Sequence, residues 1–215
     1  MSRQRTLRIG TEHELLGKLE AAGLAEEDAQ MIIASRGNKL AKEVVAFVRN
    51  VGAVTHEVIP ATAWNTVQLG THPSAMALAK AIDAQKGYGM SNWAQRILAK
   101  TPVASEPTSI DLYLISVKDL GHNQTTRRDT IYESAARLGF VSVPAEVGPQ
   151  VLLQFGDQLA VNEWLTVAME PIVDSEGLPR VFDVERSEDG CWLVAHYVSP
   201  GSEWCPVVRF LFRRK

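Results

Sequence analysis

The chain has 215 residues, of which 46% are hydrophobic and 22% are charged, a composition typical of a globular protein and not of a disordered one. Its net charge of −3 disfavours a surface devoted to nucleic-acid phosphates, although a local basic patch remains compatible with it. No apolar run approaches the ~18 residues of a membrane-spanning helix, and the basic N-terminus lacks a signal-peptide pattern. We therefore expect a cytoplasmic protein with no membrane partner.

Helical patterns dominate the first part of the chain and indicate an internal repeat. Residues 7–36 combine a short extended arm with two helices, in which apolar residues recur at helical spacing. The same order of arm, helix, turn and helix returns at residues 67–100, where residues 93–99 match residues 28–34 at Ala, Gln, Ile and Ala. We interpret the two segments as related helical hairpins.

A boundary between two parts of the chain is expected near residue 60. Residues 39–50 show a third amphipathic helix, and residues 52–66 follow without a clear period and contain Pro60. We predict a helical region with a partial repeat unit at residues 1–60 and an α+β domain at residues 61–215.

The middle of the chain predicts a strand, a helix and an irregular segment. Residues 110–117 are typical of a buried strand, and residues 127–138 of a helix that Gly139 ends. Residues 143–149 contain too much Pro and Gly for regular structure, and residues 150–155 fit a strand or a short helix.

The C-terminal part reads as a sheet. Four strand-like runs are separated by turn-forming links: residues 164–169, 180–186, 191–198 and 207–212. Asp189 and Gly190 are the strongest hairpin signal, because a type I′ turn requires positive φ at both central residues. Short connections join antiparallel neighbours, so we predict a four-stranded antiparallel meander whose third strand is covered on both faces. The predicted fold class is α+β, with a helical N-terminal part containing two related helical hairpins before this meander.

Several strings after residue 66 carry a resemblance to a known family. They include Gly70-Thr71-His72, Ser91-Asn92-Trp93-Ala94, residues 144–150, Glu163-Trp164-Leu165 and residues 168–172. Through them, residues 67–215 resemble a family of small uncharacterised bacterial proteins, some of which are labelled as helicases. The chain has no Gly-rich phosphate loop ending in Lys-Ser/Thr and is too short for helicase motor domains. The resemblance therefore implies no activity, cofactor or functional residue.

Three carboxylates are the candidate catalytic residues. Glu146 lies in the Pro/Gly-rich segment, Glu170 follows the first run of the sheet, and Asp174 lies in the next turn. If they met at one edge of the sheet, their pKa values would be pushed apart, as acid–base hydrolysis requires. In the structural alternative, which we favour, Glu170 accepts backbone N–H bonds beside Pro171 and Asp174 caps its own turn.

Aromatic and basic residues of the sheet are the candidate binding residues. Trp192 and Trp204 accompany Arg209 and Arg213, and aromatic side chains beside basic ones can stack nucleic-acid bases. The arginines fit equally well a charged edge that prevents pairing with another sheet. Trp204 follows a turn, so it is the tryptophan we expect to be exposed, as an anchor for a protein partner.

Cysteines and histidines predict no metal site and no cofactor. Cys191 and Cys205 are expected to be free thiols, with a pairing across a hairpin as the alternative. His196 is expected to be a hydrogen-bonded side chain and not a metal ligand. None of the five histidines pairs with a Cys, His or carboxylate at a metal-binding spacing. We predict a non-catalytic binding module for a protein partner or small ligand, with a small hydrolase and a nucleic-acid binder as alternatives. The oligomeric state stays open.

Overall fold

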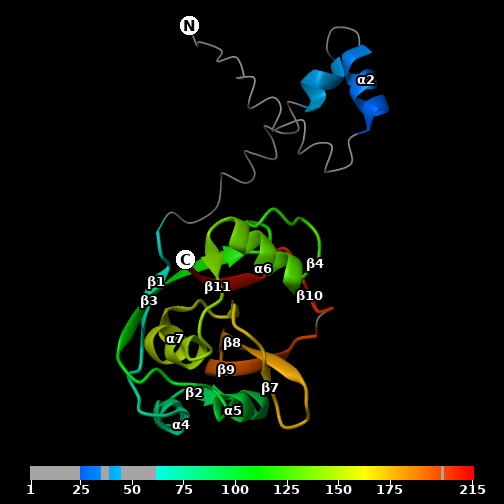
Figure 1. Ribbon diagram of the computed structural model, residues 1–215. Helices are drawn as coiled ribbons and strands as arrows, with labels where there is room; N and C mark the ends of the chain where they lie inside the picture. The colour runs from blue at the N-terminus through cyan, green and yellow to red at the C-terminus, as the bar shows by residue number, and fades with distance from the viewer. Residues whose placement is uncertain (1–24, 35–38, 45–61, 200) are drawn as a thin grey trace, which may run out of the picture. The chain divides into compact units, whose positions relative to one another are not determined.

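The chain divides into two compact units, Met1–Val54 and Thr55–Lys215, in a computed structural model that describes residues 25–34, 39–44, 62–199 and 201–215 (Figure 1). In the first unit the described residues include the helix α2, Glu26–Ala34, on which Met31 and Ile33 are exposed. No helix among the described residues is long and apolar enough to span a membrane.

One mixed sheet organises the second unit. Its strands are β1 (Asn65–Leu69), β2 (Tyr88–Met90), β3 (Thr108–Ser116), β5 (Phe140–Val141), β6 (Glu163–Val167), β7 (Ile172–Val173), β8 (Pro179–Ser187), β9 (Gly190–Tyr197) and β11 (Arg209–Arg214). The strand order is β1-β3-β11-β6-β8-β9-β2, with β5 beside β11 and β7 beside β8. The pairs β11–β6 and β2–β9 are parallel, and the other pairs are antiparallel. A separate two-stranded ribbon joins β4 (Thr126–Arg127) to β10 (Glu203–Trp204).

Helices cover the two faces of the sheet unequally. They are α4 (Ala75–Ala84), α5 (Asn92–Leu98), α6 (Arg128–Arg137), α7 (Val147–Phe155) and the 3-10 helix η2 (Gly156–Gln158). On one face α7 lies so close to β8 that a Cβ on Gly148 would be 2.8 Å from the Phe182 Cβ. On the other face Tyr132 of α6 packs edge-on against Phe210 and Phe212. Figure 1 shows α4 and α5 at the β2–β9 end of the sheet, away from α6.

Local signals explain where several elements begin and end. Ser74 and Ser91 cap α4 and α5 by accepting the backbone N–H of the residue three positions later. The predicted strand at residues 110–117 and the predicted helix before Gly139 are confirmed as β3 and α6, although within β3 only Leu112 and Ile115 are buried. The segment at residues 143–149 is not irregular throughout, because α7 begins at Val147. Pro149 lies in the first turn of that helix, where its missing N–H is not needed.

The predicted fold class, α+β with a four-stranded antiparallel meander, is wrong. Three of the four runs do pair in sequence as β6, β8 and β9, but β11 lies on the far side of β6, is parallel to it, and pairs with β3. The connection between β9 and β11 is long enough to contain β10 and to return past β8. The rule that short links join antiparallel neighbours therefore does not reach β11.

The predicted internal repeat is also wrong. Residues 67–100 contain the strands β1 and β2 as well as two helices, so they do not form a helical hairpin with an arm. Gly89, in the middle of this segment, lies in β2 against the Trp192 ring, where a Cβ would come within 2.4 Å of that ring. Most of the first copy, residues 7–36, lies outside the described residues.

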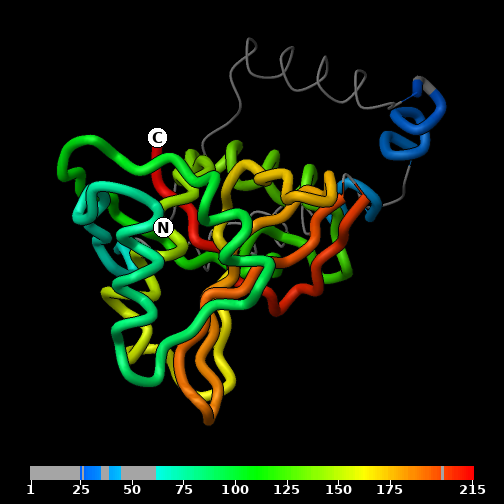
Figure 2. The backbone as a smooth tube through the Cα atoms, turned by 90° about the horizontal axis from the view of Figure 1, so that it is seen from below, coloured from blue at the N-terminus to red at the C-terminus, as the bar shows by residue number. Residues whose placement is uncertain are grey.

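The hairpin between β8 and β9 is present, one residue away from its expected turn. Ser187 pairs with Gly190, so Glu188 and Asp189 form the link. Gly190 has a φ of +140° and a Cβ there would lie 2.0 Å from the Gly87 carbonyl oxygen. Figure 2 shows the two strands side by side along their length.

The third predicted strand of the meander, β9, was expected to be covered on both faces, and the side-chain burial contradicts this. Residues 180–184 of β8 are all buried, whereas Trp192 and Tyr197 of β9 are 37% and 45% exposed. The strand covered on both faces is therefore β8 and not β9. As a consequence, Asp183 is buried, with 6% of the whole residue exposed.

Candidate functional site

The three carboxylates predicted for catalysis lie in separate surroundings. Glu146 is buried and accepts hydrogen bonds from the backbone N–H groups of Gly70 at 2.8 Å and Ala104 at 2.7 Å, and from the Gln150 side chain at 2.9 Å. It therefore ties α7 to the end of β1 and to the loop before β3. Glu170 is exposed.

Asp174 is held within its own turn. Its carboxylate accepts hydrogen bonds from the Arg180 Nε at 2.6 Å and from the backbone N–H groups of Glu176 and Leu178. Burial raises the pKa of Asp174, but these hydrogen bonds outweigh it and lower the pKa to about 2. No hydrogen bond or ion pair joins Glu146, Glu170 and Asp174 among the described residues, so the structure does not bring them together.

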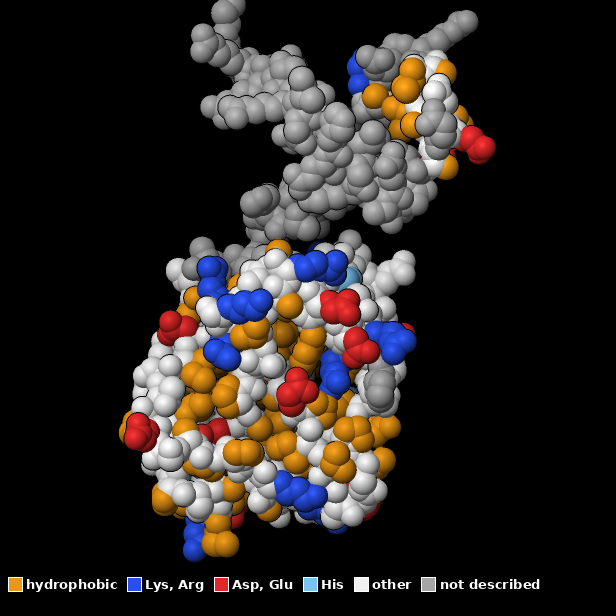
Figure 3. Space-filling view, in the orientation of Figure 1, with side chains coloured by type: hydrophobic (Ala, Val, Ile, Leu, Met, Phe, Trp, Pro, Cys, Tyr) orange, Lys and Arg blue, Asp and Glu red, His pale blue; other side chains and the backbone are white. Residues whose placement is uncertain are grey.

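The predicted basic binding residues are engaged within the protein. Arg209 Nη2 lies 2.7 Å from Glu163 Oε1, and Arg213 Nε donates to the Ser142 carbonyl oxygen at 3.2 Å. On the face drawn in Figure 3, basic side chains are interspersed with acidic ones and do not form a stripe. Both arginines lie on β11, which pairs with β3 on one side and β6 on the other, so they belong to an interior strand and not to the charged edge expected as the alternative.

Trp204 was expected to be the exposed tryptophan, but other tryptophans are more exposed. Trp204 is 7% exposed and packs on Phe210, with ring centroids 5.6 Å apart, so the expectation that it is exposed is wrong. Trp164 and Trp192 are 46% and 37% exposed. Trp164, Glu185 and Trp192 are paired positions on β6, β8 and β9, which places all three on the face of the sheet that α6 covers only in part.

A pocket with a volume of about 340 Å³ opens on this face. Its walls include Trp164, Thr166, Asp183, Glu185, His196 and Trp204. The strand register explains the arrangement. Thr166 pairs with Asp183 and Trp164 with Glu185, so the four side chains form two adjacent rows on one face. His196 enters from β9, and Trp204 from the ribbon strand β10.

Asp183 is a buried carboxylate of the pocket with too few hydrogen-bond partners. Its Oδ1 atom is buried without a hydrogen-bond partner, and its Oδ2 atom lies 3.8 Å from His196 Nδ1. Burial raises the pKa of Asp183 to about 7; the Thr166 hydroxyl opposes this rise and the charge of Glu185 adds to it. Burial also raises the pKa of Glu185, against the influence of His196.

The lining of the pocket is acidic and aromatic. Glu203 adds a third carboxylate to Asp183 and Glu185, and neither Lys nor Arg lines the pocket. His196 is exposed, and its ring centroid lies 6.5 Å from that of Trp204. Such a lining suits a positively charged group, because carboxylates attract it and a tryptophan face binds cations through its quadrupole.

Sequence reasoning missed Asp183 and Glu185 because alternation with Phe182 and Val184 is also the pattern of a solvated face. One signal in the sequence could have identified them. The predicted meander places β6 beside β8, so Trp164 and Thr166 of β6 are expected next to Asp183 and Glu185 of β8. The alternation could not indicate that Asp183 is buried, because the residues that cover it come from distant parts of the chain.

The described residues contain no group of three or more His, Cys, Asp or Glu side chains able to hold a metal ion. Cys191 is buried and Cys205, which lines the acidic pocket, is exposed; both are free thiols.

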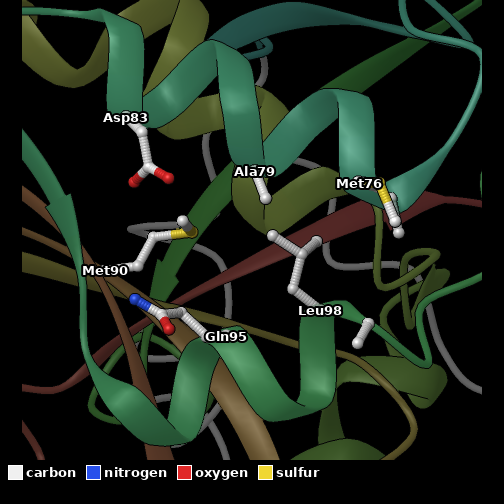
Figure 4. A pocket seen from close by; sticks show the side chains of 8 residues that line it. Met76, Ala79, Asp83, Met90, Gln95 and Leu98 are labelled. Carbon is white, nitrogen blue, oxygen red and sulfur yellow. The ribbon is translucent and has the colours of Figure 1, made fainter.

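A second cavity, with a volume of about 300 Å³, lies between α4 and α5. Figure 4 shows Met76, Ala79 and Asp83 of α4 facing Met90, Gln95 and Leu98. Its walls are mostly apolar, and Asp83 is its single carboxylate. This cavity has less chemical specificity than the acidic pocket.

Searches against protein-family models, curated proteins and solved structures find no match for the chain. The resemblance to a bacterial family therefore stays a prediction, and the functional argument depends on the chemistry of the acidic pocket.

Proposed function

We propose that the second unit is a non-catalytic binding domain, whose acidic pocket binds a small organic cation. The observation that carries the proposal is the composition of the pocket: Asp183, Glu185 and Glu203 lie with Trp164 and Trp204 around one cavity that no Lys or Arg lines. A volume of about 340 Å³ is at the lower end of the range for small-ligand sites, roughly 300 to 1,000 Å³.

The same composition disfavours anionic ligands. A phosphate or carboxylate in this pocket would face three acidic side chains, and no Lys or Arg lines the pocket to offset their charge. Nucleic-acid binding at this site is disfavoured for the same reason. For a cation, each well-placed tryptophan face contributes about 0.5 to 2 kcal/mol in addition to the attraction of the carboxylates.

The test compares ligands of one size and different charge by isothermal titration calorimetry on the full chain. We expect n-butylamine and n-butylguanidine to bind, and n-butanol and n-butyrate to bind at least about tenfold more weakly, since each lost charge-assisted contact costs roughly 1.5 to 3 kcal/mol. Glu185→Gln should weaken binding of the cations. Glu133→Gln is the matched control, because Glu133 is an exposed residue of α6 that does not line the pocket. Equal binding of n-butyrate and n-butylamine would refute the proposal.

Asp183 and Glu185 also favour a second candidate, a hydrolase. They lie two residues apart on one face of β8, roughly 7 Å between their Cα atoms, and burial raises both pKa values. Acid–base hydrolysis of glycosides uses two carboxyl groups roughly 5 to 9.5 Å apart, and side chains of two such neighbouring positions can reach this range. If the protein hydrolyses aryl glycosides between pH 5 and 8 and Asp183→Asn abolishes this activity, the hydrolase replaces the binding proposal. If the protein binds n-butylamine and hydrolyses no aryl glycoside, binding stands as the function.

A further inference from the structure

Resting on the proposed cation site, we infer that the bound cation carries N–H bonds, donates one of them to the Asp183 carboxylate, and displaces a proton from that carboxyl group as it binds. This inference names the class of ligand, primary ammonium or guanidinium, and a regulation of the site by pH. It separates these ligands from fully substituted ammonium ions, which a tryptophan-lined pocket alone would accept equally well.

The geometry of Asp183 leaves its carboxyl group in need of a donor. The side chain is nine-tenths buried, its exposed fraction being 9%, and Oδ1 has no hydrogen-bond partner. Among the described residues the only basic side chain within 4 Å is His196, at 3.8 Å, which exceeds a hydrogen-bond distance. A buried carboxylate oxygen without a donor is costly, and the Thr166 hydroxyl offsets only part of the burial of this carboxylate, so a ligand that supplies an N–H group gains more here than at an exposed acid.

Among the described residues, no Lys or Arg of the surrounding elements forms an ion pair with Asp183. The ionisable side chains around it are Glu185 on β8, His196 on β9, Glu203 on β10, Tyr132 and Arg128 on α6, and Glu170 after β6. Tyr132 already donates its hydroxyl to the Met169 carbonyl oxygen, and Arg128 stands over the Tyr132 ring, 5.6 Å from its centroid, without forming an ion pair with Asp183. The ligand is therefore left to supply the compensating charge.

Proton exchange follows from the same burial. Because the pKa of Asp183 is raised to about 7, the empty pocket holds this carboxyl group partly protonated at neutral pH. A cation requires the carboxylate form, so the proton passes to the buffer while the ligand's N–H bond stays intact. The apparent affinity should then fall about tenfold for each pH unit below this range, where one proton is exchanged per ligand.

The experiment compares n-butylammonium with n-butyltrimethylammonium on the full chain by titration calorimetry. Each titration is made at pH 8 and pH 6, in two buffers that differ in their enthalpy of ionisation. We expect n-butylammonium to bind roughly ten- to a hundredfold more tightly than the trimethyl compound at pH 8. We also expect it to release close to one proton at pH 6, and Asp183→Asn to remove both effects.

Each outcome bears on a different claim. Equal affinity for the two cations, or binding at pH 6 without proton release, overturns the further inference and leaves the cation site in place. If neither cation binds at either pH, the proposed function itself is wrong. Proton release is measured on the unaltered chain, so the result does not depend on the folding of Asp183→Asn.

Discussion

Asp183 links the folding of the sheet to pH. Its ordinary pKa of 3.8 is raised to about 7 by burial, so the folded chain binds a proton between these values that the unfolded chain does not. The protein therefore loses stability as pH rises from about 4 to 7, and this loss is complete above pH 7. The loss is on the order of 4 kcal/mol at most, at about 1.4 kcal/mol per pH unit.

We predict that Asp183→Asn stabilises the protein at pH 8 and does so much less at pH 4. The asparagine has no charge to desolvate, so it should gain on the order of 2 to 4 kcal/mol over Asp183 at pH 8. Urea unfolding followed by tryptophan fluorescence at both pH values measures the difference. Asp189→Asn, at an exposed position in the turn between β8 and β9, serves as the control for the same chemical change outside the buried site. An equal effect of Asp183→Asn at the two pH values would contradict this account of its burial.

At the scale of elements, Glu146 is the point where three segments are joined. Its two carboxylate oxygens accept the N–H groups of Gly70 and Ala104 separately. Glu146→Gln preserves the size of the side chain but turns one acceptor into a donor, so one of these N–H groups loses its partner. We predict a loss of roughly 2 to 3 kcal/mol in the free energy of unfolding. Amide hydrogen exchange should accelerate most at Gly70 or Ala104. A uniform acceleration over the whole sheet would contradict a local role of Glu146 in connecting these segments.

Gly190 determines how closely β2 approaches the β8–β9 hairpin. A Cβ there would meet the Gly87 carbonyl oxygen, which accepts the Cys191 N–H at 2.8 Å. We predict that Gly190→Ala costs about 2 kcal/mol or more, because it adds a clash to the strain of a φ of +140°. Gly177→Ala is the matched control: its φ is +82° with nothing within 4 Å of an added Cβ, so it should cost only about 1 kcal/mol. Thermal unfolding of both variants compares the two costs, and equal losses would contradict the close approach.

Elements could be predicted from the sequence where the signal is local. Apolar periodicity up to Gly139 marks α6, and the hydrophobic run before Lys118 marks β3. The place of β11 could not be predicted, because its neighbours β3 and β6 are distant in sequence and no turn residue indicates them. The three-residue β2 gives almost no signal by itself.

The candidate site was predictable only in part, for a related reason. Trp204 was identified as a binding residue, and it does line the acidic pocket, but as a buried wall and not as an exposed anchor. Whether a carboxylate such as Asp183 is solvated depends on what covers its face of the sheet. That cover includes α6 and β10, whose positions follow from the assembled sheet and not from the local pattern.

At the scale of the whole molecule, the sheet and the acidic pocket use residues of the second unit alone. The first strand of the sheet begins at Asn65, and Trp64 adds a backbone hydrogen bond from its N–H to the Leu112 carbonyl oxygen at 2.7 Å. We predict that a fragment of residues 55–215, which is the whole second unit and keeps this bond, folds cooperatively and binds n-butylamine within about twofold of the full chain, since RT ln 2 is only about 0.4 kcal/mol.

A second fragment provides the control for that boundary. Residues 70–215 lack β1, which leaves the edge of β3 without its partner and removes the buried side chains of Val67 and Leu69. Burial of two such side chains stabilises by roughly 3 to 6 kcal/mol, a large part of the stability of an ordinary domain. This shorter fragment should therefore unfold or aggregate, as circular dichroism and gel filtration would reveal. If the longer fragment fails in the same way, the first unit contributes to the folding of the sheet, and the division of the chain into independent units is refuted.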